Sequence, residues 1–175
     1  MVKKPFKRGS RWIFIIGILA ILSIGFANRS VHLLLIEDAR RARPVFVMKI
    51  HPGDMISIGF LHSVENCHVW DHLQIDSQFE LIVVATEFAE SRTGLPYAAF
   101  EGESFERLKD GFRISNMHRR VPEIYQWVDS KYENTLKING DQVIPLASLA
   151  GNILLHIHIA KRTLLEWAIM EARLF

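Results

Sequence analysis

Apolar positions divide the chain into one continuous hydrophobic stretch followed by a series of short alternating segments. Residues 12–27 carry no charge, and as a helix they span about 24 Å. This is shorter than the roughly 20 apolar residues that usually cross a membrane. The stretch follows a basic cluster made of Lys3, Lys4, Lys7, Arg8 and Arg11. A basic segment before an apolar one is typical of an export signal or a membrane anchor.

Two outcomes remain open for residues 1–30, which we interpret as a signal peptide or a transmembrane anchor. Gly25 and Ala27 are small residues placed as in a signal-peptidase site before Asn28, which favours cleavage. An uncleaved anchor would take extra length from its flanks. In both cases the basic cluster places the N-terminus in the cytoplasm. We therefore expect a single-pass protein of the cytoplasmic membrane with an extracytoplasmic domain, or an exported protein after cleavage.

The remainder, residues 31–175, predicts one extracytoplasmic β domain. Its apolar segments are short, lie about ten residues apart and are not separated by long helical patterns. Such spacing is typical of an all-β fold, here a compact antiparallel sandwich or barrel-like domain. The expected strands cover residues 33–36, 45–50, 56–61, 68–75, 79–88, 132–138, 141–146 and 152–160.

Turn residues predict how some of these strands connect. Residues 51–54 contain Pro52 and Gly53, and we expect them to close a hairpin between strands 45–50 and 56–61. Asn139 and Gly140 lie between two apolar runs, which is the strongest short-range hairpin pattern. At the C-terminus, Thr163 followed by Glu166 forms a capping-box pattern, and a short amphipathic helix over residues 164–173 is expected to pack on the sheet.

Composition narrows the class of protein. The apolar fraction of 49% and the charged fraction of 23% are those of a folded globular domain. The net charge is only +2, and basic residues are dispersed after the N-terminus, which argues against nucleic acid as a partner. Cys67 is the sole cysteine, so an intramolecular disulfide and a paired-cysteine zinc site are excluded.

Residues that could bind a ligand or act in catalysis are concentrated after the predicted strand 56–61. His62 and Glu65 could bind a metal or act as acid and base, although their spacing matches no diagnostic motif. A solvent-facing strand end is the alternative. Ser63 beside His62 lacks the Gly-x-Ser-x-Gly elbow of a serine hydrolase. The polar set comprises His62, Ser63, Glu65, Asn66, His68, Asp71 and His72.

Two further features give weaker indications of a binding site. His156 and His158 alternate on a predicted strand and therefore share one face. They form either a paired-histidine metal site or, as we prefer, a solvent-facing pair opposite a buried face of Leu155, Ile157 and Ile159. The loop of residues 90–96 contains Gly94, which permits either a turn or a close ligand approach.

The segment Phe60-Leu61-His62-Ser63-Val64-Glu65, followed by Val69 and then Gly94-Leu95-Pro96, resembles a bacterial family called domain of unknown function 1850. The resemblance runs from about residue 45 to about residue 159. The family usually has a proline and an acidic residue soon after His-Ser-Val. Here the proline is missing and Asp71 takes the place of the acidic residue.

The resemblance implies an N-terminal signal or anchor and an association with tripartite TRAP-type transporters that use a TAXI-type binding protein. It therefore implies a non-catalytic accessory of solute uptake, with a TRAP-type permease or its TAXI-type solute-binding protein as partner. A metal-assisted hydrolase using His62, Glu65 and Asp71, or a structural envelope protein, are the alternatives. No metal or cofactor is assigned. The expected binding residues are His62, Ser63, Glu65, Asp71, Gly94, Leu95 and Pro96.

Overall fold

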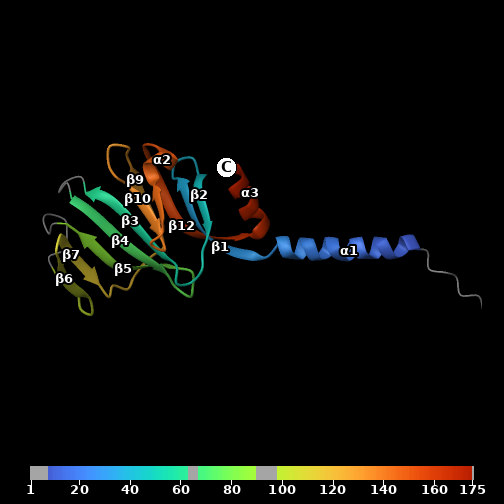
Figure 1. Ribbon diagram of the computed structural model, residues 1–175, viewed down its shortest axis with the longest axis horizontal. Helices are drawn as coiled ribbons and strands as arrows, with labels where there is room; N and C mark the ends of the chain where they lie inside the picture. The colour runs from blue at the N-terminus through green and yellow to red at the C-terminus, as the bar shows by residue number, and fades with distance from the viewer. Residues whose placement is uncertain (1–7, 63–66, 90–97, 175) are drawn as a thin grey trace, which may run out of the picture.

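The computed structural model describes residues 8–62, 67–89 and 98–174, and shows a long helix that projects from a β-rich domain (Figure 1). The elements are α1 (Arg8–Ala27), β1 (Ser30–Asp38), β2 (Arg43–Lys49), β3 (Met55–His62), β4 (Cys67–Ile75), β5 (Leu81–Phe88), β6 (Ser104–Leu108), β7 (Gly111–Ser115), β8 (Arg119–Val121), β9 (Glu123–Val128), β10 (Thr135–Ile138), β11 (Gln142–Pro145), α2 (Leu146–Ala150), β12 (Ile153–Thr163) and α3 (Leu164–Leu174).

Within the described residues, the strands form two antiparallel sheets. The first sheet has the order β2-β1-β12-β9, and the second has the order β11-β10-β3-β4-β5-β7-β6, with β8 paired to β5. β1 and β12 lie at the centre of the first sheet and pair along their length, from Ser30 opposite Thr163 to Asp38 opposite Leu155. The first and last strands of the domain therefore meet side by side.

The core lies between the two sheets. The first sheet contributes the buried residues Leu34 of β1 and Leu155 of β12 to this core. The second sheet contributes Ile56 of β3 and Leu73 of β4. In β3, β4 and β12 these residues alternate with exposed or half-buried ones, whereas in β1 both faces are buried. The structure confirms the expected antiparallel β domain between an N-terminal and a C-terminal helix, and the two open sheets do not close into a barrel.

Helix α3 covers part of the outer face of the first sheet. Trp167 and Met170 of α3 pack against Leu33 and Leu35, which alternate with the core residues of β1. The predicted capping box is present, because Thr163 N donates to Glu166 Oε2 at 2.7 Å and Glu166 N donates to Thr163 Oγ1 at 3.2 Å. The predicted C-terminal helix and its packing on the sheet are thus confirmed.

The prediction of a hairpin across residues 51–54 is wrong. β2 pairs with β1 in the first sheet, whereas β3 pairs with β4 and β10 in the second. The connection instead carries the chain from one sheet to the other. Gly53 adopts a φ of 95°, and His51 N donates to Asp54 Oδ2 at 2.7 Å. These local features close a turn equally well in a hairpin and in a crossing between sheets.

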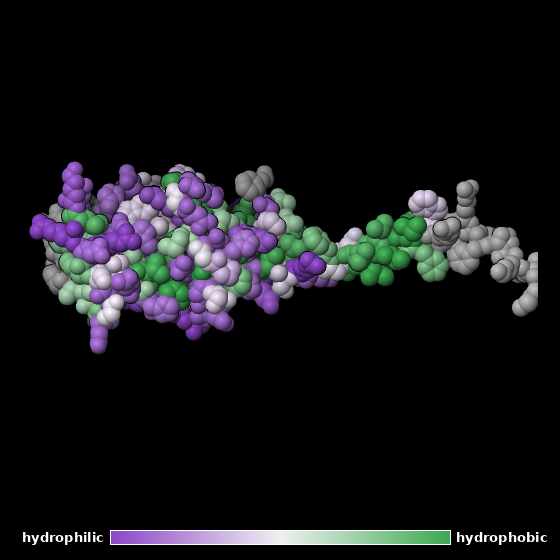
Figure 2. Space-filling view, turned by 60° about the horizontal axis from the view of Figure 1, so that its bottom comes forward, coloured by the Kyte–Doolittle hydropathy of each residue, from purple (hydrophilic) through white to green (hydrophobic). Residues whose placement is uncertain are grey.

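Helix α1 exposes its apolar side chains on every side. Ile13 and Ile21 are 72% and 71% exposed, and the green surface of this helix stands apart from the mixed surface of the domain in Figure 2. Among the helices of the described residues, none has the combination of length and apolar character that a membrane crossing requires.

Candidate functional site

His62 is the last residue of β3. It is half-buried and lies opposite Cys67 of β4. A groove of about 240 Å³ begins beside it. The far wall of this groove comes from β9 and the connection to β10, and includes Trp127 and Tyr132, which are both half-exposed. The side chain of Trp127 lies on the outward face of β9, because it alternates with the core residue Val128. We call this feature the His62 groove; its lining residues are Phe60, Leu61, His62, Gln126, Trp127, Asp129, Tyr132 and Asn134.

Asn134 holds the connection that forms this far wall. Its side chain is only 5% exposed, and its Nδ2 donates to the carbonyl of Tyr132 at 3.1 Å. Its own carbonyl accepts from Leu146 N at 2.9 Å. Asp129 caps the start of the same connection, because its Oδ1 accepts from Lys131 N at 2.9 Å. The far wall is therefore held in place by contacts with the backbone. The sequence analysis missed this wall, because no local pattern places β9 and the connection to β10 beside the end of β3.

Asp71 does not lie beside His62. Both are on the core-facing side of the second sheet, but Asp71 lies opposite Ile58, four residues before His62 on β3. That separation is about 13 Å along a strand. Burial raises the pKa of the Asp71 carboxyl, and a hydrogen bond with Thr86 partly opposes this effect. Asp71 is thus a half-buried polar residue of the sheet interior.

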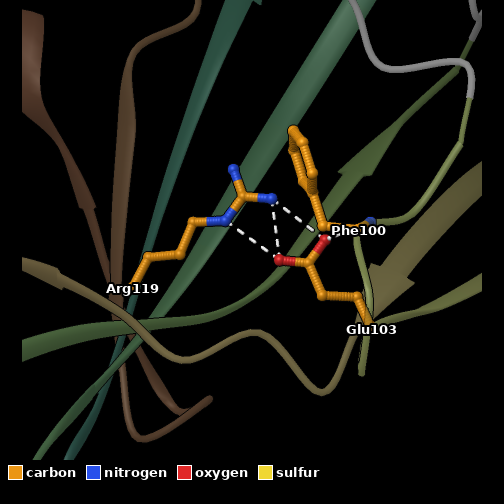
Figure 3. Close-up of polar contacts among 3 residues, drawn as sticks. All are labelled: Phe100, Glu103 and Arg119. Carbon is orange, nitrogen blue, oxygen red and sulfur yellow. Dashed lines mark hydrogen bonds and ion pairs between the residues drawn. The ribbon is translucent and has the colours of Figure 1, made fainter.

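Five of the predicted binding residues, Ser63, Glu65, Gly94, Leu95 and Pro96, lie outside the described residues. The chain beyond the Gly94-Leu95-Pro96 segment is held by Glu103 and Arg119 (Figure 3). Arg119 Nη2 donates to Glu103 Oε1 at 2.7 Å, and Phe100 N donates to Glu103 Oε2 at 3.1 Å. The Arg119 guanidinium also lies 4.9 Å from the centroid of the Phe100 ring. These contacts fix the chain at Phe100, shortly before β6 begins.

A polar network crosses the outer face of the second sheet. Ser57 Oγ lies 2.8 Å from His72 Nδ1, and His72 Nε2 lies 3.5 Å from Glu87 Oε1. Arg113 donates to the same Glu87 oxygen at 3.0 Å. Burial lowers the pKa of His72, and the nearby Glu87 carboxylate acts in the opposite direction. The imidazole therefore favours its neutral form.

The order Ser-His-Glu is that of a hydrolytic triad, but its surroundings favour a structural role. Ser57 lies in the middle of β3, which pairs with β10 on one side and β4 on the other. The backbone N–H groups beside it are used in these ladders and cannot donate to a developing oxyanion. Ser57 also lies on a pleated surface, without the sharp turn that exposes a nucleophile. We interpret the network as a cross-strand contact.

His156 and His158 of β12 lie on the outer face of the first sheet, while Leu155 and Ile157 face the core. This is the arrangement predicted from their alternation. The two imidazole rings stack, with centroids 4.2 Å apart, and the ring of Tyr125 stacks on that of His156 at 4.7 Å. The pair therefore faces away from the core. The described contacts of α3 with this outer face do not include either histidine.

The structure is therefore that of a two-sheet β domain, joined to an exposed apolar helix, with the His62 groove at one end. A family model described as Domain of unknown function (DUF1850) matches residues 56–146, which is more than half of the chain. The chain belongs to this family. The match runs from β3 to β11 and includes all eight lining residues of the His62 groove. No curated protein and no solved structure matches the chain.

Proposed function

We propose that this protein is a non-catalytic binding module at the outer face of the cytoplasmic membrane, where it serves as an accessory of a TRAP-type solute transport system. The observation that carries the proposal is the His62 groove. Trp127 and Tyr132 are 50% and 41% exposed beside it. Aromatic side chains that stay exposed around a preformed groove are typical of protein interfaces.

Attachment to the membrane is supported by α1. A helix that is apolar on all sides is stable in water only when something covers it. The described part of α1 has no such cover from the domain, and a basic cluster precedes it. Under the proposal, α1 holds the domain at the membrane, with the cluster on the cytoplasmic side.

The position of the groove favours one of the two candidate partners. β3 begins at Met55 and ends at His62, a distance of about 23 Å along a strand. Figure 1 shows α1 leaving one end of the domain and β3 running toward the other end. A groove so far from α1 is better placed for a soluble protein than for a membrane-embedded surface. We therefore propose the TAXI-type solute-binding protein as the partner, with the TRAP-type permease as the second candidate.

The test is a crosslinked pull-down of the full-length protein from its native membranes, with partners identified by mass spectrometry. We expect a solute-binding protein with the wild-type chain, and its loss with Trp127→Ala and Tyr132→Ala. Val143→Ala, which removes an exposed apolar side chain of β11 outside the groove, is the matched control and should retain the partner. Recovery of the same partner with all three variants would contradict the groove as the binding surface.

A further inference from the structure

The outer face of the first sheet brings together two imidazoles and a carboxylate. Glu37 of β1 lies opposite His156 of β12, and His158 is two residues further along the same strand. One ligand atom from each of Glu37, His156 and His158 lies within 4.8 Å of the other two, and all three residues are half-buried. We propose that these residues form a binding site for a divalent transition-metal ion, with Zn²⁺ as the best-matched ion.

The donor set favours this class of metal. Two imidazole nitrogens and one carboxylate oxygen are ligands of zinc sites that keep a position open for water or another ligand. Imidazole suits zinc, copper and nickel, whereas magnesium and calcium prefer oxygen ligands alone. Tetrahedral ligands at about 2.0–2.1 Å from zinc lie about 3.4 Å apart. The observed separations, at most 4.8 Å, require only small side-chain rotations to reach that geometry.

The structure also holds one of the imidazoles in position. Glu123 of β9 accepts a hydrogen bond from His156 Nε2 at 2.8 Å. The contact places the proton on Nε2 and leaves the lone pair on Nδ1. A carboxylate that orients a histidine in this way is a regular feature of metal sites. The ring of Tyr125 stacks on the other side of His156 and further limits its rotation.

His158 supplies an independent indication. Its Nδ1 is buried and has no hydrogen-bond partner among the described residues. A buried imidazole nitrogen without a partner is unfavourable, and binding of a metal ion at this nitrogen would remove the penalty. The site is independent of the His62 groove, because its ligands lie on the outer face of the first sheet and none of them lines that groove.

The proposal is tested with the full-length chain, purified in detergent without a histidine tag and stripped of metal with a chelator. Titration with Zn²⁺ should give one tight site per chain. Co²⁺ should give the visible absorption bands of a four- or five-coordinate ion. His158→Gln and Glu37→Gln should each weaken Zn²⁺ binding at least tenfold and abolish the Co²⁺ bands. Glu123→Ala, which removes only the positioning contact, should weaken binding about 10- to 100-fold.

His118→Gln is the matched control, because it removes an exposed histidine on the connection between β7 and β8. It should leave Zn²⁺ binding unchanged. Circular dichroism verifies that each variant is folded, and Glu37→Gln tests the site even where a histidine variant fails to fold. Absence of a tight Zn²⁺ site in the wild-type chain, or a tight site that persists in Glu37→Gln and His158→Gln, would overturn the proposal.

Discussion

Gly59 of β3 lies directly beneath the indole of Trp70 on β4, so that a β-carbon at Gly59 would come within 2.6 Å of the Trp70 ring. The ring is also covered by Lys137, whose Nζ lies 4.0 Å from its centroid. A side chain at position 59 must therefore displace Trp70. Only glycine fits at position 59, because the ring approaches the backbone so closely. The ring in turn covers the strand where the glycine has no side chain.

We expect Gly59→Ala to lower the free energy of unfolding by about 1–3 kcal/mol, as overpacking usually does. Urea unfolding measures this change. The double variant Gly59→Ala/Trp70→Leu is the control, because a smaller residue at position 70 makes room for the new methyl group. The substitution at Gly59 should be less harmful in that background. Equal losses in both backgrounds would show that the contact with Trp70 is not the cause.

His72 should make the domain sensitive to acid. Burial lowers the pKa of His72 below its ordinary value of 6.5, so the unfolded chain takes up this proton at a higher pH than the folded chain. The stabilisation is therefore complete above pH 6.5 and is lost as the pH falls toward the lowered value. We expect the melting temperature to fall less between pH 7 and pH 5 in His72→Gln than in the wild type. Equal slopes would contradict this assignment.

Asp71 should have the opposite effect on the pH dependence of stability. Burial raises the pKa of its carboxyl above 3.8, so the ionised side chain destabilises the folded state at neutral pH. The destabilisation disappears as the pH falls through the raised pKa toward 3.8. Asp71→Asn retains a partner for Thr86 and should raise the melting temperature at pH 7 by a few degrees. The gain should shrink as the pH approaches 4, and a gain independent of pH would point to another cause.

The Asn139-Gly140 turn fastens the β10–β11 hairpin to the connection between the two sheets. Asn139 Oδ1 accepts from Met55 N at 2.8 Å, and its Nδ2 donates to Asp54 Oδ1 at 3.1 Å. Its φ of 50° is unfavourable for alanine. Asn139→Ala should therefore lose about 1–3 kcal/mol in chemical unfolding. Asn139→Gly tolerates the φ but lacks both hydrogen bonds, so the difference between the two variants separates strain from side-chain contact.

The contact between Arg119 and Glu103 should control local opening near Phe100. In Arg119→Met, the Glu103 carboxylate loses its cation, and the amide of Phe100 should exchange hydrogen faster. Amide exchange followed by mass spectrometry over residues 98–103 measures this. Arg120→Met is the matched control, because Arg120 pairs with Glu80 instead. Unchanged exchange in Arg119→Met, or an equal increase in both variants, would contradict the anchoring role of Arg119.

The pattern of apolar residues predicted the β class, the β10–β11 hairpin and the C-terminal helix, because each depends on neighbours in the sequence. The assignment of β2 and β3 to different sheets was not predictable from the turn between them. It depends on β1 and β12, which pair over a long sequence separation. The four strands from β6 to β9 were missed. In β6 and β9, charged and aromatic residues lie on exposed faces at sheet edges and weaken the apolar pattern.

The two candidate sites could likewise be predicted only as far as local sequence patterns reach. The shared face of His156 and His158 follows from strand alternation and was predicted. Glu37 and Glu123 reach them only through the register of β1 and β9, which no local pattern contains. Likewise, His62 was recognised from its motif, whereas Trp127 and Tyr132 come from a part of the chain that only the packing of the two sheets brings near. Whether the predicted binding residues bind a partner stays a prediction.

The pairing of β1 with β12 also sets an order of events during synthesis. The centre of the first sheet is complete only when the last strand of the domain has emerged, since β12 supplies the neighbour of both β1 and β9. Until then the core face of the second sheet has no cover, and its apolar residues are open to aggregation. Folding should therefore be slow and largely post-translational, as expected for a topology of high contact order. A chain truncated before β12 should be held by chaperones or degraded.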